Sequence, residues 1–481
     1  NYALTRNQAR YLDGLLPEFS DEDIENYFQV SNGTLDPALK YKYFNTNWHE
    51  VMLRDLAPQH RTNLSLSGGN NRTRYFVSFS YLRQEALFDK KWTEWNEGYS
   101  TQQVLDRFNL RSNVDINVTD YLNVSMDLGG RIDNIQQPGI DMWNLFTWGA
   151  GENKPIFPVF TPDGSFFMPT ESDSKNGAAQ IAGRGIETNR RRNLYTNVSV
   201  EGNLGKLLNG LKVNATVGFD SYEIFQAVQR ADIDVFSYNY GADVDDPSEY
   251  TYTRMRTGIS LPNPSTSPRD YYYNVNVIGG LDYHNTFGLH NVNGKAFVRT
   301  YQNVVRGMNS SNRYLSYNAM ANYIYDNRFI FSGNLSYMGS DNFHQDDRFG
   351  LFPGGSVGWV LSEEPFMENT PVELLKLRAS LGRAGQSILG VARYPFQGSY
   401  LEGSGYNFGT SQTYWEGAYE ATTGNRNIKW ELSDMLNVGV DFDAWNRKLY
   451  GSVDRALWSC YPDGLVWEGR DQGGGNHAGA C

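Results

Sequence analysis

The 481-residue chain has very little cysteine, only Cys460 and Cys481, both close to its C-terminal end. Two such residues build neither a disulfide framework nor a zinc site of known spacing. The six histidines are scattered and form no metal-binding motif. No apolar run approaches the roughly 18 residues of a membrane-spanning helix. Positive charge is not in excess, since the formal net charge is -12. The absence of a basic stripe argues against a nucleic-acid partner.

Aromatic residues and glycine, by contrast, are abundant. Aromatics make up 14% of the chain, with 32 tyrosines, and there are 48 glycines. This composition favours strands and turns over helices. A chain of this length exceeds an ordinary domain unless it forms one large barrel or a repeat array.

Apolar and polar residues alternate between Leu105 and Arg131. A period of two marks a strand with one apolar and one polar face. Soluble strands have about 5–6 residues, whereas a tilted membrane-spanning strand needs about 9–11. The length of the alternation therefore indicates strands that cross a membrane, with Val114 and Val124 facing lipid.

Further alternating segments arrive in pairs, about fourteen in all. Turns within pairs are mostly short, with a longer connector only between 353–361 and 375–382, whereas the gaps between pairs are long. This asymmetry is typical of an outer-membrane barrel. We therefore expect an all-β, antiparallel, up-and-down transmembrane β-barrel with short periplasmic turns and long extracellular loops. The paired segments are 62–68 with 72–82, 105–118 with 121–131, 193–204 with 211–220, 273–285 with 289–301, 312–325 with 327–338, 353–361 with 375–382, and 435–443 with 449–454.

Charged residues follow the same parity. In segments 105–118, 121–131, 193–204 and 211–220, the apolar parity carries no charge apart from Asp106 at the start of the first segment. A Lys or Arg that faces lipid at the midplane costs roughly 2–4 kcal/mol, so charge belongs on the lumen face. A soluble β-sandwich would also keep charge out of its core, so this test alone leaves both architectures open. The expected lumen-facing residues are Arg107, Arg111, Asp115, Asp127, Glu201 and Lys212.

Aromatic residues in the long loops are candidates for contact with a substrate. Beside Asn and Asp, they suit stacking on sugar rings or packing on peptides, although they could equally pack among the loops themselves. These candidates are Trp143, Trp148, Tyr238, Tyr240, Tyr414 and Trp415.

The acidic stretches 232–246 and 341–347 could hold loop Ca²⁺, but they lack EF-hand spacing, so we expect no cofactor. Residues 354–358 match the G-x-S-x-G nucleophile motif, but they continue into a strand instead of a helix. No pair of carboxylates can be nominated for glycan hydrolysis. The chain is therefore not expected to be an enzyme.

Three stretches resemble the SusC/RagA-type TonB-dependent outer-membrane transporters of Bacteroidetes. The first runs from Asn45 through the Leu64-Ser65-Leu66-Ser67-Gly68-Gly69 segment to Tyr81. The second covers 351–366 and 375–382, and the third covers 427–431 and 437–442.

This resemblance implies a barrel of 22 strands with a plugged lumen. It also implies a SusD-like surface lipoprotein as partner, TonB as the energy-coupling partner, and surrounding outer-membrane lipid. The expected function is import of oligosaccharides or peptides across the bacterial outer membrane. Two alternatives stay open: a passive porin-type barrel, and a secreted glycan-binding β-sandwich.

The chain differs from the family pattern at both ends, and these differences divide it into three expected regions. Residues 1–60 are expected to be irregular with one short helix after Ser20, and 61–454 to form about fourteen of the 22 strands. The plug and the TonB-contacting N-terminal region are expected to be missing. The strand pattern is expected to break near Arg455, so that 455–481 form an aberrant tail that comes from a shifted reading frame or a truncated gene.

Overall fold

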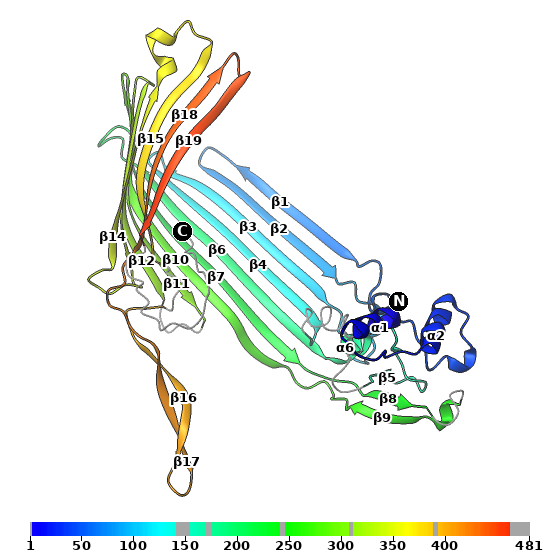
Figure 1. Ribbon diagram of the computed structural model, residues 1–481. Helices are drawn as coiled ribbons and strands as arrows, with labels where there is room; N and C mark the ends of the chain where they lie inside the picture. Colours follow the sequence, from blue (N-terminus) through cyan, green and yellow to red (C-terminus); the bar gives the residue numbers. More distant parts are fainter. Residues whose placement is uncertain are drawn as a thin grey trace.

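One antiparallel sheet of fourteen strands dominates the computed structural model, which describes residues 2–140, 154–169, 176–240, 246–306, 311–387 and 393–461. Each strand pairs with its neighbours in chain order, and the sheet curls across its width (Figure 1). The predicted all-β meander is confirmed, in one continuous sheet instead of the two packed sheets of a sandwich. The strands are β1 (Gln59–Gly69), β2 (Thr73–Glu85), β3 (Val104–Thr119), β4 (Leu122–Pro138), β6 (Ile186–Asn203), β7 (Leu211–Gln229), β10 (Ser265–Phe287), β11 (His290–Val305), β12 (Asn312–Tyr325), β13 (Phe329–Ser340), β14 (Phe349–Val360), β15 (Val372–Gln386), β18 (Glu431–Ala444) and β19 (Leu449–Tyr461).

Many strands extend beyond their predicted limits, mostly at the end where the long connections lie. β10 has 23 residues, about twice what a tilted strand needs to cross a bilayer. Side-chain alternation stops earlier than the strand does, because backbone hydrogen bonds to a neighbour do not depend on the side chains. The G-x-S-x-G motif at 354–358 lies inside β14, as its continuation into a strand predicted.

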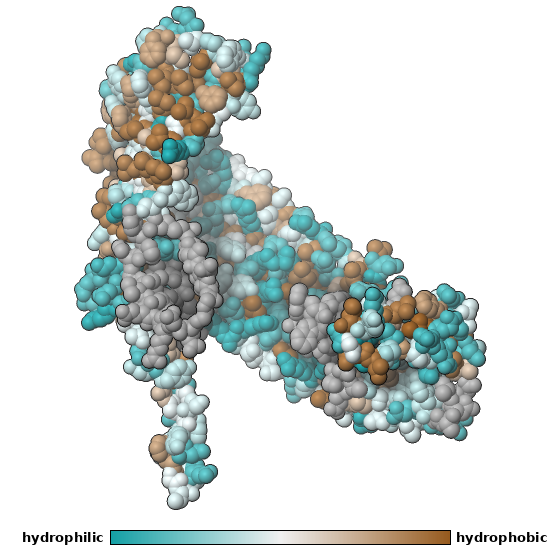
Figure 2. Space-filling model, viewed as in Figure 1, coloured by the Kyte–Doolittle hydropathy of each residue, from teal (hydrophilic) through white to brown (hydrophobic). Residues whose placement is uncertain are grey.

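The register gives the sheet two chemically different faces. Across β3 and β4, Val114 lies opposite Met126, and Ile116 lies opposite Val124. On the other face, Asp115 lies opposite Ser125. Figure 2 shows hydrophilic residues over the middle of the sheet and hydrophobic residues over β15, β18 and β19 near the short-turn end.

Short turns join the strands at one end of the sheet. Between β12 and β13, Asp326 and Asn327 take left-handed φ values of 51° and 53°. Two consecutive residues with positive φ make the tight turn that matches the twist of a hairpin. Asn and Asp tolerate this conformation better than other non-glycine residues.

The segment before β1 and the longer connections between strands carry the remaining elements. A small sheet joins β5, β8 and β9, and a separate hairpin of β16 and β17 projects from the long-loop end (Figure 1). Among the described residues, no helix is long and apolar enough to span a membrane. The strands are β5 (Phe166–Phe167), β8 (Val235–Asn239), β9 (Thr251–Arg256), β16 (Ser399–Phe408) and β17 (Thr413–Thr422). The helices are α1 (Tyr2–Leu12), α2 (Asp21–Asn32), α3 (Trp48–Met52), α4 (Lys90–Thr93), α6 (Gly177–Gly183), η1 (Pro37–Leu39), η3 (Pro247–Glu249), η4 (Leu361–Glu363) and η5 (Pro365–Met367).

The first 58 residues are more helical than expected. The predicted helix after Ser20 is α2, and a capping box begins it: the Asp23 amide donates to Ser20 Oγ at 3.1 Å, and the Ser20 amide donates to Asp23 Oδ2 at 2.9 Å. α1 and α3 were missed. α1 lacks an acidic first turn. α3 is preceded by Asn47 and has Glu50 in its first turn, but its five residues are too few to show a helical period.

The predicted break at Arg455 is wrong as far as Tyr461. β19 pairs with β18 along its whole length, up to Tyr461 opposite Leu432. The regular hydrogen-bonding edge of β18 holds this strand although its sequence departs from the family style. The frameshift origin of the tail stays a prediction, and residues 462–481 lie outside the described part of the chain.

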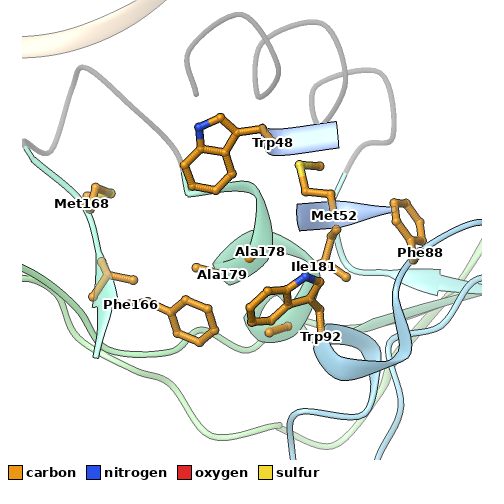
Figure 3. Close-up of a cluster of buried hydrophobic side chains, with 11 residues drawn as sticks. Trp48, Met52, Phe88, Trp92, Phe166, Met168, Ala178, Ala179 and Ile181 are labelled. Carbon is orange, nitrogen blue, oxygen red and sulfur yellow. The ribbon is translucent and has the colours of Figure 1, made fainter. Parts of the chain in front are cut away.

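A hydrophobic core lies at the long-loop end, away from the strand faces. Its residues come from α3, from the β2–β3 connection, from the β4–β6 connection and from the β7–β10 connection (Figure 3). The Trp48 indole N–H also donates to the Lys154 carbonyl at 3.1 Å. The long loops therefore form a packed layer. The buried core residues are Trp48, Met52, Phe88, Trp92, Phe166, Met168, Ala178, Ala179, Ile181, Ala182 and Val235.

Truncation of this core should loosen the loop layer and leave the sheet intact. Ile181 is 0% exposed, so Ile181→Ala should cost roughly 2–5 kcal/mol of local stability. Hydrogen exchange should then accelerate in 86–103 and 177–183. Ile259→Ala, at a side chain that is 60% exposed, serves as the matched control. Equal acceleration in both variants would contradict the assigned core.

Candidate functional site

The polar face of the sheet is the candidate site. The strand registers place all six predicted lumen-facing residues on this one face. That they line a lumen stays a prediction. These residues are Arg107, Arg111 and Asp115 on β3, Asp127 on β4, Glu201 on β6 and Lys212 on β7.

Towards the long-loop end, a buried carboxylate gathers two arginines. Asp133 is 1% exposed, and it accepts from Arg107 Nε at 2.8 Å and from Arg131 Nη2 at 2.5 Å. A buried carboxylate is strongly unfavourable unless it is paired, so this contact holds both guanidinium groups against the polar face of the sheet. Asp133 was missed because it lies two residues beyond the predicted strand, although it continues the polar parity.

Nearer the middle of the strands, polar side chains bond mainly to each other. Ser125 Oγ donates to Asp115 at 2.8 Å, and the Asn113 amide donates to Asp127. Arg111 Nε donates to Asn113 Oδ1 at 3.0 Å. The result is a lattice of donors and acceptors in which each charged group already has a partner.

The lattice continues across β6, β7, β10 and β11. Lys212 Nζ lies 2.8 Å from Glu201 Oε1, and both side chains are about half exposed. On the same face, Asp282 accepts from the Asn214 amide and lies 3.4 Å from Lys295 Nζ. Exposed pairs of this kind contribute little to stability, typically about 0–1 kcal/mol. They do give the surface a hydrated, charge-balanced character.

At the far edge of the sheet, Arg378 on β15 bridges two strands. Its Nε lies 3.1 Å from Asp441 on β18, and its Nη2 lies 2.8 Å from Asp454 on β19. The sequence places these residues far apart, and only the β15–β18–β19 register brings them together. The resemblance covered Arg378 and Asp441 but gave them no role.

The candidate loop aromatics divide into packed and exposed residues. Tyr238 stacks on Tyr250 with 5.8 Å between ring centroids, and its hydroxyl donates to the Tyr41 carbonyl at 2.7 Å. Burial raises the pKa of Tyr238, and it raises the pKa of Tyr240 to about 12, so both stay neutral donors at physiological pH. Tyr238 thus packs among the loops, which was the alternative reading of these aromatics.

The other candidates differ from Tyr238. Tyr240 is 39% exposed, whereas Tyr414 and Trp415 on the β16–β17 hairpin are 57% and 64% exposed. Trp143 and Trp148 lie outside the described residues. Substrate contact by any of these side chains stays a prediction.

The acidic loop stretches face cationic side chains. Asp232 lies 3.0 Å from Arg184 and 3.4 Å from Arg256. Asp341 lies 2.8 Å from Arg393. Within the described ranges, no group of three or more His, Cys, Asp or Glu residues is arranged to hold a metal ion. The absence of a cofactor stays an expectation.

Known proteins similar to this chain are TonB-dependent receptors. No protein-family model matches it. TonB-dependent receptor P3 from Formosa agariphila is 24% identical over 434 residues, covering 85% of this chain and 40% of the relative. TonB-dependent receptor SusC from Bacteroides thetaiotaomicron is 34% identical over 146 residues, covering 30% and 14% respectively.

A solved structure, described as the RagAB peptide transporter, shares the fold. It matches with a TM-score of 0.62 and 16% identity, covering 95% of this chain and 51% of that chain. The present chain therefore spans about half of the solved chain, and 40% of the Formosa receptor.

The buried ion pairs of Asp133 provide a test of the polar lattice. Asp133→Asn removes the charge that compensates Arg107 and Arg131, which are partly exposed, so we expect a loss of roughly 1–3 kcal/mol. Asp127→Asn makes the same change on the same strand at an exposed side chain and should cost under about 1 kcal/mol. Urea unfolding in lipid vesicles measures both. A larger effect at Asp127 would contradict the assignment.

Proposed function

Because the chain belongs to the SusC/RagA family of TonB-dependent receptors of the outer membrane, we propose that it forms barrel wall in a transporter that imports nutrients. The proposed import is active and depends on TonB. Two relatives, TonB-dependent receptor P3 and TonB-dependent receptor SusC, support this proposal by their names. No covalent chemistry and no cofactor are required for it.

The observation that carries the proposal is the contrast between the two faces of one long-stranded sheet. One face bears Val114, Val198 and Val217 in register, which suits lipid. The other face bears the lattice from Arg107 to Lys295, which suits a water-filled passage. Because lattice members satisfy each other, a passing solute can exchange hydrogen bonds with the wall without leaving a buried charge unpaired.

We propose oligosaccharides or peptides as the imported class. Both carry many hydrogen-bonding groups, and a wall of alternating amides, hydroxyls and ion pairs can match them without strong retention. The solved structure with the same fold is described as a peptide transporter, which supports peptides as the imported class. Tyr414 and Trp415 are exposed on the β16–β17 hairpin, which projects from the long-loop end (Figure 1). Their position suits contact with substrate or with a SusD-like lipoprotein lid.

Dependence on TonB separates this function from a passive pore. Cells that express the intact protein should accumulate labelled oligosaccharides or peptides, and disruption of TonB should abolish that accumulation. The wild-type strain is the positive control, and a strain without this gene is the negative control. Undiminished uptake without TonB would replace the proposal by the porin-type alternative.

The assignment of the two faces is tested by matched charge insertions on β6. Val198→Arg places a charge on the apolar face between Met126 and Val217, and it should destabilise the folded protein by roughly 2–4 kcal/mol. Asn197→Arg places the same charge on the polar face opposite Asp127 and should be nearly neutral. Urea titration in lipid vesicles gives both values. The reverse order would mean that the faces are exchanged.

A further inference from the structure

The apolar face of the wall ends in a row of charged residues towards the long-loop end. On β6, the apolar parity of Val198 and Leu194 continues as Arg192 and then Arg190. On neighbouring strands and the same face, Arg83 lies opposite Asp106. Charge on the outward face is costly at the membrane midplane but nearly free at its edge. This row therefore marks the edge of the apolar band.

Two adjoining cavities lie on either side of that edge. The cavity within the apolar band has a volume of about 540 Å³ and is lined by Phe79, Phe108, Leu110, Gly130, Ile132 and Leu194, among others. Gly130 keeps this groove deep, because a Cβ there would meet no atom within 4 Å. The five larger side chains are each more than one third exposed.

The second cavity lies beyond the edge and is polar. It has a volume of about 700 Å³, and Arg83, Asp106, Asn134 and Arg190 contribute to its lining. The β2–β3 connection covers part of it, held there by a hydrogen bond from the Gln136 amide to the Ser100 carbonyl at 2.9 Å. Ile132 and Arg192 line both cavities, so the apolar groove leads directly into the polar cavity.

The polar cavity has more positive than negative groups free to bind a ligand, because its carboxylates are paired and two of its arginines are not tightly paired. Each of its carboxylates already has a cationic partner: Glu85 lies 2.9 Å from Arg54, Glu94 lies 3.8 Å from Lys90, and Asp106 lies 3.1 Å from Arg83. Arg192 has only a loose contact with Glu223 at 3.7 Å, and its side chain is 57% exposed.

Arg190 is the second arginine of the polar cavity whose positive charge is available to a ligand. It forms no ion pair with any carboxylate in the described part of the chain, and its side chain is exposed. An apolar groove that opens beside one free and one loosely held guanidinium matches acyl chains joined to a phosphate.

We propose that these two cavities form a binding site for an anionic, phosphorylated lipid of the membrane leaflet at the long-loop end. The phosphate would be bound by Arg190 and Arg192, and an acyl chain would lie in the groove over Gly130. The site is on the outer surface of the wall, so it requires the outer-membrane location but not the proposed import.

Native mass spectrometry of the intact, delipidated protein in detergent tests this site, with lipid A as the phosphorylated probe. Wild type should retain one lipid A, whereas Arg190→Gln combined with Arg192→Gln should weaken retention roughly 30-fold, from about fivefold for each arginine. Gly130→Leu should also weaken retention by filling the groove while both arginines remain. Arg61→Gln, which removes a positive charge on the opposite face near the same end, should not change it.

Several results would overturn the proposal. Equal retention by wild type and the double variant would do so, as would equal retention of zwitterionic phosphatidylcholine. Full displacement by millimolar inorganic phosphate would identify a simple anion site instead of a lipid site. Each variant must first show the gel mobility shift of a folded barrel, so that lost binding is not confused with lost folding.

Discussion

Backbone hydrogen bonding between neighbouring antiparallel strands is the constraint on which the rest of this structure depends. Within a bilayer, every backbone N–H and C=O group must find a partner in the protein. The unbroken pairing from β1 to β19 meets that need for the twelve inner strands, whereas β1 and β19 each keep one edge without a strand partner among the described residues. The same hydrogen bonds hold β10 and β19 in strand form where side-chain alternation fails. Side chains are thereby free to specialise by face.

Two kinds of surface follow from that freedom. The apolar face needs little beyond size and hydrophobicity, because lipid makes no directional demands. The polar face needs defined partners, since a charged group near the wall must be balanced. Asp133 meets this demand with two arginines from different strands, and Arg378 meets it with two aspartates. In the proposed transporter, balance of this kind would let water and polar solutes contact the face without meeting an unpaired charge.

The long-loop end is organised by different physics. There, the hydrophobic core around Ile181 and Trp92 binds distant connections into one layer. This packing draws Tyr238 inward, while the β16–β17 hairpin keeps Tyr414 and Trp415 exposed. The long-loop end therefore combines a packed layer of loops with one exposed hairpin that projects from it.

The sequence by itself determined the fold class, the approximate positions of the fourteen strands and the shared face of the six charged residues expected on the polar side, because alternation with a period of two is local information. Only the tertiary structure decided which residues meet across strands. The Asp133 and Arg378 contacts, the loop core and the cavities beside Arg192 all depend on register and on long-range packing. Register follows from how each strand docks on its neighbour, and a single strand's pattern is compatible with several such alignments.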